Sequence, residues 1–246
     1  TCDYSKGRMM HDETCPHCHG LGFIGYDVEP GDPRFGKAFL CPVIYATTWD
    51  EEMGIARHEA ARLNWHNFNK TTDQAKLIQK TIAELLREGH GMAYLHGQPG
   101  LGKTLHAKSA CIIAHYKYNR VARYTSQSKM MDWLRTSFDD EYGQSTYARR
   151  LKELAEIDFL VMDEVGRLNP TDFATATLSE IVDRRYTNAD TKTTIWLSNM
   201  PPEQVMDDYQ VDRIKDSRFV VAHIDGLSYR QTDVRIEEDE LWWQKL

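Results

Sequence analysis

From about residue 72 onward, short apolar runs alternate with amphipathic stretches along the chain. Five of the apolar runs have the length and composition of β-strands, at 92–96, 121–125, 159–162, 194–198 and 219–224. Apolar residues recur at helical spacing over about 72–88, 103–118, 127–138, 145–156 and 171–187. Strands that alternate with helices predict a parallel sheet covered on both faces, and hence an α/β fold.

The first 45 residues have a different pattern, with most of the cysteines, many Gly and Pro residues and little helical periodicity. We predict a small loop-rich module at 1–45, a linker at 46–70 with a short helix over 49–64, a main domain at 71–232 and a C-terminal tail at 233–246. No apolar run is long enough to span a membrane. Since no secretory leader is visible either, we expect a cytoplasmic protein without a membrane partner.

The strand at 92–96 runs into a glycine-rich loop that opens the next helix. The loop has the pattern GxxxxGK[ST] in the strand–loop–helix context that this motif requires. Glycines let backbone N–H groups turn toward a phosphate, and the helix adds its positive end. The motif predicts ATP binding, with Lys103 on the β- and γ-phosphates and the Thr104 hydroxyl on Mg²⁺. The predicted nucleotide-binding residues of this segment are Gly97, Pro99, Gly100, Leu101, Gly102, Lys103, Thr104 and Leu105.

Two carboxylates, Asp163 and Glu164, directly follow the apolar run at 159–162. Parallel strands deliver their carboxyl ends to one edge of a sheet, so this pair is expected beside the glycine-rich loop. Asp163 would orient Mg²⁺ through its water shell, and Glu164 would polarise the water that attacks ATP. An acidic pair at a strand end is often only a solvated loop, but its pairing with a phosphate loop favours an ATPase site.

Net charge limits the mode of any nucleic-acid binding. The formal net charge is −7, which argues against a protein that coats nucleic acid through bulk positive charge. A local basic groove stays compatible with this value.

Cysteines gather near the N-terminus. Their odd number, five, makes a poor disulfide framework. Cys15, Cys18 and Cys41 have spacings typical of a structural zinc site, although free thiols are the alternative. The candidates for a fourth ligand are Cys2, His11, His17 and His19. Cys2 is favoured, because the histidines at 17 and 19 are crowded against Cys18.

Beyond these motifs, the chain resembles the DnaC/DnaI helicase-loader branch of the AAA+ ATPases, which includes the IstB transposition ATPase. The resemblance covers roughly residues 64–230 and rests on three further strings, IVDRRY at 181–186, VDRI at 211–214 and SYR at 228–230. It implies a P-loop AAA+ fold with a five-stranded parallel sheet flanked by helices. It also implies self-assembly into a ring, spiral or filament, with ATP between neighbouring subunits.

The resemblance also assigns roles by position. Asn199, after the strand at 194–198, resembles the family's polar sensor between the carboxylates and the γ-phosphate. Arg213 resembles the arginine finger that reaches the γ-phosphate of the next subunit, and Arg218 is a rival for that role. Arg230 resembles an arginine that contacts nucleotide within its own subunit. A cation supplied by a neighbour would stabilise transition-state charge and couple hydrolysis to assembly.

The segment 126–139 follows the second strand and, in the loader branch, holds a helix that lines a groove for single-stranded DNA. By this resemblance Lys129 and Arg135 would follow phosphates, while Ser126 and Gln127 would donate hydrogen bonds. The alternative is an ordinary amphipathic helix that buries the apolar side chains at 130, 131, 133, 134 and 138.

These observations predict an ATP-dependent loader that assembles around single-stranded DNA and places a hexameric replicative helicase on it. The N-terminal module would dock on the helicase, as the resemblance to loaders of the DnaI type implies. A first alternative is an IstB-like transposition ATPase that remodels duplex DNA and recruits a transposase. A second is an interaction protein whose ATP site only gates partner binding. The predicted cofactors are ATP, Mg²⁺ and Zn²⁺.

Overall fold

The structure, a computed structural model, describes residues 19–21, 23–25, 27–32, 35–40, 53–65, 68, 72–139, 143–167, 171–229 and 242–245. The chain forms two compact units, residues 1–57 and 58–246. Part of the stretch expected as a linker, from residue 58 on, lies within the larger unit.

The described part of the smaller unit contains an antiparallel hairpin of β1 (Phe23–Gly25) and β2 (Ala38–Leu40). The sequence predicted only loops here, because three-residue strands carry too little alternation to be recognised. The predicted zinc ligands Cys2, Cys15, Cys18 and Cys41 all lie outside the described residues. Within the residues that are described, no cluster of three metal-ligating side chains occurs.

A five-stranded sheet forms the centre of the larger unit, and every neighbouring pair of its strands is parallel. Across the sheet, the strands are β4 (Ala122–Ser126), β5 (Phe159–Val165), β6 (Thr193–Ser198), β3 (Gly91–His96) and β7 (Val220–His223). The predicted parallel sheet is thus confirmed. The order places β3, which carries the glycine-rich loop, between β6 and β7.

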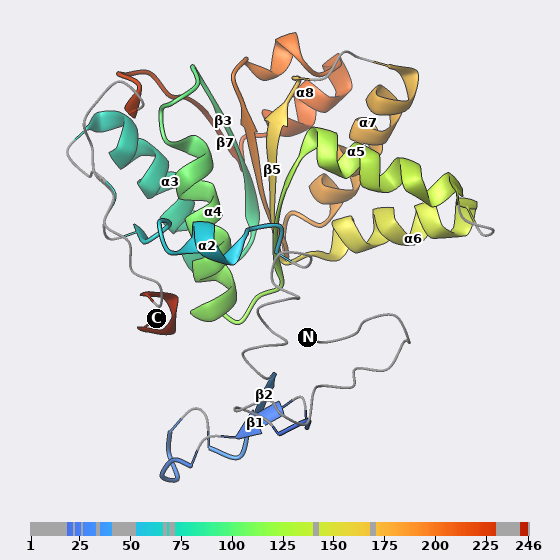
Figure 1. The fold of residues 1–246 in the computed structure, drawn as a ribbon. Helices are drawn as coiled ribbons and strands as arrows, with labels where there is room; N and C mark the ends of the chain where they lie inside the picture. The colour runs from blue at the N-terminus through green and yellow to red at the C-terminus, as the bar shows by residue number, and fades with distance from the viewer. Residues whose placement is uncertain are drawn as a thin grey trace. The chain divides into compact units, whose positions relative to one another are not determined.

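Helices cover both faces of this sheet (Figure 1). On one side lie α3 (Asp73–Glu88) and α4 (Lys103–Tyr116). On the other lie α5 (Gln127–Arg135), α6 (Gly143–Glu156), α7 (Asp172–Thr187) and α8 (Asp208–Ile214). Short helical turns complete the described part, namely α2 (Arg57–Ala60), η2 (Thr136–Asp139), η3 (Pro202–Gln204) and η5 (Trp242–Lys245).

Two helices differ from the sequence predictions. The helix expected over 49–64 is present in the described residues only as α2, and Gly54, with a φ of 72°, has a left-handed backbone that an α-helix excludes. The seven-residue helix α8 was not predicted, since it is too short to show helical periodicity. Its start is nevertheless encoded by a capping box between Asp207 and Gln210.

The core between the sheet and α5–α8 is built from alternate strand residues. Tyr94, Met162 and Trp196 point from three neighbouring strands into one apolar cluster and are 1% exposed or less. Leu134 and Ile181 pack into it from α5 and α7. This packing fixes the helices against the strands whose ends carry the candidate site.

Arg185, on α7, lies within the core with no exposed surface. Its guanidinium donates to the carbonyl oxygens of Leu154, Ala155, Ile157 and Thr193 and to the Thr194 hydroxyl. Burial lowers the pKa of Arg185 to about 9. The side chain therefore ties the end of α6 to β6, because it satisfies carbonyl groups that the helix end leaves unpaired.

Replacing Arg185 with methionine should lower the free energy of unfolding by about 3–5 kcal/mol, since several buried carbonyl groups would lose their donor. Arg184→Met is the matched control, because Arg184 forms a half-exposed i,i+4 ion pair with Glu180. Loss of that pair should cost about 0.3–0.5 kcal/mol. Urea unfolding followed by circular dichroism measures both, and equal effects would contradict a structural role for the buried guanidinium.

Residues 242–245 pack against other residues of the larger unit. The Trp242 indole N–H donates to the carbonyl oxygen of Ala60, at 2.9 Å, and both Trp242 and Trp243 are buried. The Trp243 ring lies 6.4 Å from that of Tyr116 on α4. No helix among the described residues is both long and apolar enough to cross a membrane.

Candidate nucleotide-binding site

The glycine-rich loop needs its glycines because of their backbone conformation and because residues after β7 crowd it. Gly97 has a φ of 145°, and a Cβ there would lie 2.0 Å from the carbonyl oxygen of Ile224. Gly100 has a φ of 89°, and a Cβ there would lie 2.0 Å from the Ser228 hydroxyl oxygen. The segment after β7 therefore forms the outer support of the loop, and only glycine fits at both positions.

The loop presents positive groups to its concave side. Helix α4 begins after Gly102 with no side-chain cap, so its first N–H groups are open to an anion. The Lys103 ammonium donates to the carbonyl oxygens of Gly97 (2.6 Å) and Gln98 (3.0 Å). Burial lowers the pKa of Lys103 to about 8, although Asp163 acts in the opposite direction. A phosphate is the ligand that this arrangement favours, since it would restore the stability of the buried charge.

The acidic pair lies on β5 within an irregularity of the strand. The register of β5 against β6 shifts between Met162 and Val165, which places Asp163 and Glu164 in a bulge. Glu164 has a φ of 56°, and its N–H donates to the Asp163 carboxylate at 2.7 Å. Bulges turn side chains away from the regular alternation of a strand. Both carboxylates consequently line the cavity beside the loop.

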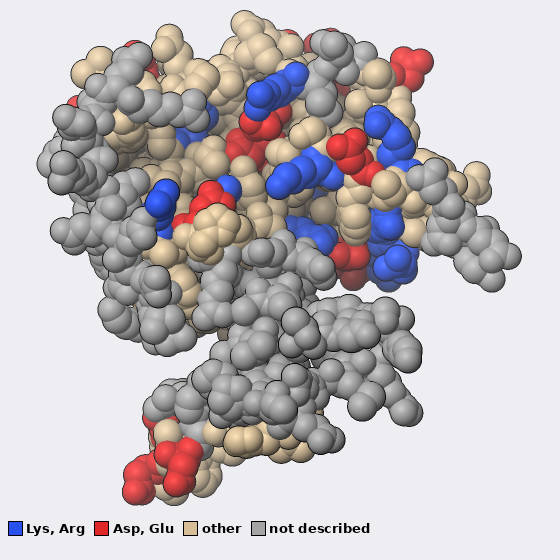
Figure 2. Space-filling view, in the orientation of Figure 1, with Lys and Arg blue, Asp and Glu red and all other residues tan. Residues whose placement is uncertain are grey.

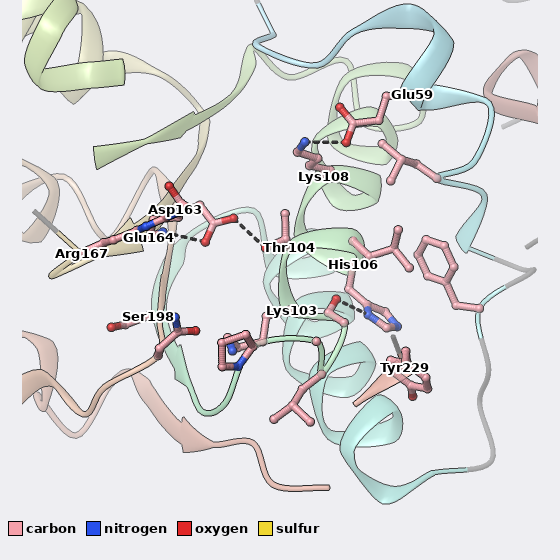
Figure 3. A pocket seen from close by; sticks show the side chains of 18 residues that line it. Glu59, Lys103, Thr104, His106, Lys108, Asp163, Glu164, Arg167, Ser198 and Tyr229 are labelled. Atoms are coloured by element: carbon pink, nitrogen blue, oxygen red, sulfur yellow. Dashed lines mark hydrogen bonds and ion pairs between the residues drawn. The ribbon is translucent and has the colours of Figure 1, made fainter. Parts of the chain in front are cut away.

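Asp163 meets the first turn of α4 directly. The Thr104 hydroxyl donates to Asp163 Oδ2 at 2.7 Å (Figure 3). The Tyr124 hydroxyl donates to the same oxygen at 2.8 Å. Thr104 and Asp163 supply hard oxygen atoms next to a phosphate-binding loop, which is the chemistry that Mg²⁺ requires. The residues present therefore fit this ion.

A cavity of about 680 Å³ joins these groups (Figure 3). All of the predicted residues from Pro99 to Leu105 line it, together with Asp163, Glu164 and Asn199. Its other lining residues are Glu59, Leu63, Phe68, His106, Lys108, Arg167, Ser198 and Tyr229. The volume suits a nucleotide with its phosphates at the loop.

The end of the cavity away from the carboxylates is partly apolar. Leu63, Phe68 and Tyr229 line it, and the Phe68 ring lies 4.8 Å from that of His106. His106 Nδ1 donates to the Gly102 carbonyl at 2.8 Å, and burial lowers the pKa of this histidine, which keeps it neutral. The wall fits a nucleobase, which stacks on apolar and aromatic groups. Leu63 and Phe68 were not predicted as site residues, although the sequence has an aromatic pair at 65 and 68 before α3.

Asn199 lies at the turn after β6, as predicted. The Ser198 hydroxyl donates to the Val165 carbonyl at 2.7 Å and accepts from the Met200 N–H at 3.1 Å. The Tyr94 hydroxyl donates to the Met200 carbonyl at 3.0 Å. These hydrogen bonds hold the turn, and Asn199 lines the same cavity as Glu164.

The candidate arginines lie elsewhere. Arg213, on α8, forms an ion pair with Asp183 and lies over the rings of Tyr186 and Tyr209, with distances to the ring centres of 5.1 and 3.9 Å. Arg218 pairs with Asp216 and Asp190. Neither arginine is among the described residues that line the cavity, and Arg230 lies outside the described residues.

The predicted DNA segment divides into buried and exposed residues. The Ser126 hydroxyl caps α5 by accepting from the Lys129 N–H, and the Gln127 amide oxygen accepts from the Gly166 N–H at 2.7 Å. Both side chains are buried, and the hydrogen bonds given above join them to other residues of the same subunit. Lys129 and Arg135 are exposed. The structure thus separates two internal hydrogen-bonding residues from two accessible cations.

A glycine-rich phosphate loop after β3, an acidic pair on β5, which β6 separates from β3, and the strand order around them define a P-loop ATP-binding protein. A family model described as IstB-like ATP binding protein matches residues 52–241. The chain therefore belongs to this family, a membership that supports ATPase activity.

Two curated relatives match over shorter stretches. "Uncharacterized protein YdaV" of Escherichia coli is 36% identical over 106 residues, which are 43% of this chain. The "Insertion sequence IS1162 putative ATP-binding protein" of Pseudomonas fluorescens is 27% identical over 134 residues, which are 54% of this chain. The matched parts amount to 41% and 53% of the lengths of these relatives.

Solved structures share the fold at low sequence identity. The chain superposes on the DnaC helicase loader with a TM-score of 0.57 at 19% identity, covering 70% of this chain and 100% of that one. DnaI gives a TM-score of 0.57 at 18% identity, covering 70% and 96%. The initiator DnaA bound to AMPPCP and single-stranded DNA gives 0.55 at 19% identity, covering 65% and 49%. These matches support the AAA+ fold predicted from the sequence.

Proposed function

We propose that this protein is an ATP-driven loader that assembles on single-stranded DNA and delivers a replicative helicase to it. The observation that carries the proposal is the position of Arg213 and Arg218. The nucleotide cavity contains a phosphate loop, an acidic pair and a sensor, but neither of these arginines lines it. Arg167, the arginine that does line the cavity, pairs with Glu164. A neighbouring subunit is therefore the proposed source of an arginine for the γ-phosphate, and assembly then becomes a condition for hydrolysis.

The proposed hydrolysis uses residues with separate tasks. Lys103 and the start of α4 would bind the phosphates, and Thr104 and Asp163 would hold Mg²⁺, which supplies charge neutralisation when bound. Glu164 would accept the proton of the attacking water, and Asn199 would orient that water beside the γ-phosphate. Each side chain lies in the first turn of α4, at the end of a strand or in the turn after one, and the sheet fixes these places, so the site is preorganised for this role.

A basic and aromatic surface supports the DNA part of the proposal. Figure 2 shows Lys and Arg side chains gathered over α5 and α6, with carboxylates between them. Lys129, Arg135 and Arg149 are exposed on these helices. Phe138, with half of its surface exposed, stacks on Tyr147 at 5.2 Å. Cations that follow a backbone and exposed rings that stack on bases are the two elements of single-strand binding.

Lys129→Glu should weaken single-stranded DNA binding and lower the slope of log affinity against log salt concentration by about one unit for each phosphate that is no longer neutralised. Nucleotide affinity should stay unchanged, because Lys129 does not line the cavity. Lys80→Glu is the control, since Lys80 is exposed on α3 across the sheet. Fluorescence anisotropy with labelled oligonucleotides measures the affinity, and equal decreases in both variants would contradict a DNA contact at Lys129.

The family match and the insertion-sequence relative favour a second candidate, a transposition ATPase that remodels duplex DNA and recruits a transposase. Anisotropy with single- and double-stranded oligonucleotides, in ATP and in ADP, separates the two. The loader should prefer single strands in ATP. A preference for duplex would transfer the proposal to the transposition ATPase, and no DNA binding in any nucleotide state would leave only ATP-gated partner binding.

A further inference from the structure

Tyr124, on the edge strand β4, is tied to the acidic pair by a hydrogen bond that no motif predicted. Its hydroxyl donates to Asp163 Oδ2 at 2.8 Å. A carboxylate oxygen only accepts, so the phenol O–H is the donor in this contact.

Asp163 is held by three donors from three directions. Oδ2 accepts from the hydroxyls of Thr104 and Tyr124, and Oδ1 accepts from the Glu164 N–H. A carboxylate oxygen has two lone pairs, so Oδ2 is fully used. Because the Thr104 hydroxyl uses its proton to bond Asp163, the lone pairs of the Thr104 oxygen stay free for a cation. Tyr124 thus fixes the orientation in which the carboxylate meets α4.

The Tyr124 ring has its own support. The Lys108 ammonium lies 4.5 Å from the centre of the ring, and the same group forms a 2.6 Å ion pair with Glu59. A cation over the face of an aromatic ring is attractive, and the ion pair limits its movement. Lys108 and Glu59 come from α4 and α2, so three separate elements hold the phenol in place.

We propose that Tyr124 is a positioning residue for Mg²⁺, which acts by fixing the Asp163 carboxylate toward Thr104. The inference rests on the magnesium assignment within the proposed function. Residues that orient a metal-binding group commonly influence metal affinity by about 10–100-fold. Tyr124 therefore strengthens the coupling between Mg²⁺ and nucleotide without touching the nucleotide itself.

The test compares Tyr124→Phe with Tyr147→Phe. Each variant loses one partly buried hydroxyl and keeps its ring, but the Tyr147 hydroxyl pairs with Thr177, which does not line the cavity. The measurement is the affinity for a fluorescent ATP analogue in saturating Mg²⁺ and in EDTA. The ratio of the two affinities gives the coupling between metal and nucleotide.

For Tyr124→Phe we expect a coupling ratio about tenfold below that of the wild type, with an unchanged affinity in EDTA. Tyr147→Phe should keep the wild-type ratio. A Tyr124→Phe ratio within twofold of the wild type, or an equal loss in Mg²⁺ and in EDTA, would overturn the inference. If the wild-type protein bound the ATP analogue with the same affinity in Mg²⁺ and in EDTA, the magnesium assignment would instead be overturned, and this inference with it.

Discussion

Glu164→Gln should retain ATP and hydrolyse it about 10²–10⁴-fold more slowly than the wild type. Glutamine keeps the size of the side chain and its place in the β5 bulge, but an amide cannot accept the proton of an attacking water. The geometry supports this assignment, because Glu164 lines the cavity next to Asp163 and Asn199. Nucleotide binding should survive, since the phosphate loop and Thr104 are untouched.

Single-turnover hydrolysis with excess enzyme measures the chemical step, and filter binding measures ATP retention. Glu180→Gln is the control, because Glu180 pairs with Arg184 on α7 and does not line the cavity. Hydrolysis by Glu164→Gln at the wild-type rate would show that another group activates the water. Loss of binding together with activity would show that the glutamate shapes the site rather than acting in catalysis.

The Arg213→Ala variant should bind ATP as tightly as the wild type. Its rate of ATP hydrolysis should fall by about 10³-fold or more, which is the effect typical of losing an arginine that a neighbouring subunit supplies. In one subunit the Arg213 guanidinium pairs with Asp183 and lies over Tyr209, outside the cavity. These contacts hold the side chain on the surface of α8. We expect the neighbour's phosphates to compete for it when subunits assemble.

A mixing experiment tests whether this arginine acts on the neighbour's nucleotide. Subunits with Arg213→Ala supply an intact phosphate loop, and subunits with Lys103→Ala supply an intact arginine. Mixtures should regain activity at the hybrid interfaces, whereas each variant alone should stay inactive. Absence of rescue at every ratio would argue against action between subunits, and the same mixtures with Arg218→Ala would then test the rival residue.

Much of the fold and the centre of the site could be predicted from the sequence, because both depend on local patterns. All five strands of the main sheet lie within a few residues of the predicted runs. The pattern is clearest in β3, β5 and β6, which are short and mostly buried. The phosphate loop was predictable because its backbone conformation demands glycine at fixed places. Strand β5 is longer than expected, since the strand resumes at Val165 after the bulge.

The remaining parts of the site depend on contacts distant in sequence, which no local pattern encodes. Leu63 and Phe68 reach the cavity from a stretch expected to be a linker, and Tyr124 reaches Asp163 from a neighbouring strand. The role of Gln127 could not be predicted either. Its amide oxygen accepts a hydrogen bond from the Gly166 N–H, and only the fold brings these two residues together.

The support of the phosphate loop by residues near 224–229 has a consequence for the order in which the protein becomes functional during synthesis. Gly97 rests against the Ile224 carbonyl, and the Tyr229 N–H donates to the Gly100 carbonyl at 2.9 Å. A nascent chain released only as far as β6 has the complete glycine-rich motif but lacks the backbone that holds it. ATP retention on the ribosome would therefore begin only once residue 229 has left the exit tunnel, and nucleotide binding would report that the phosphate loop has gained its support.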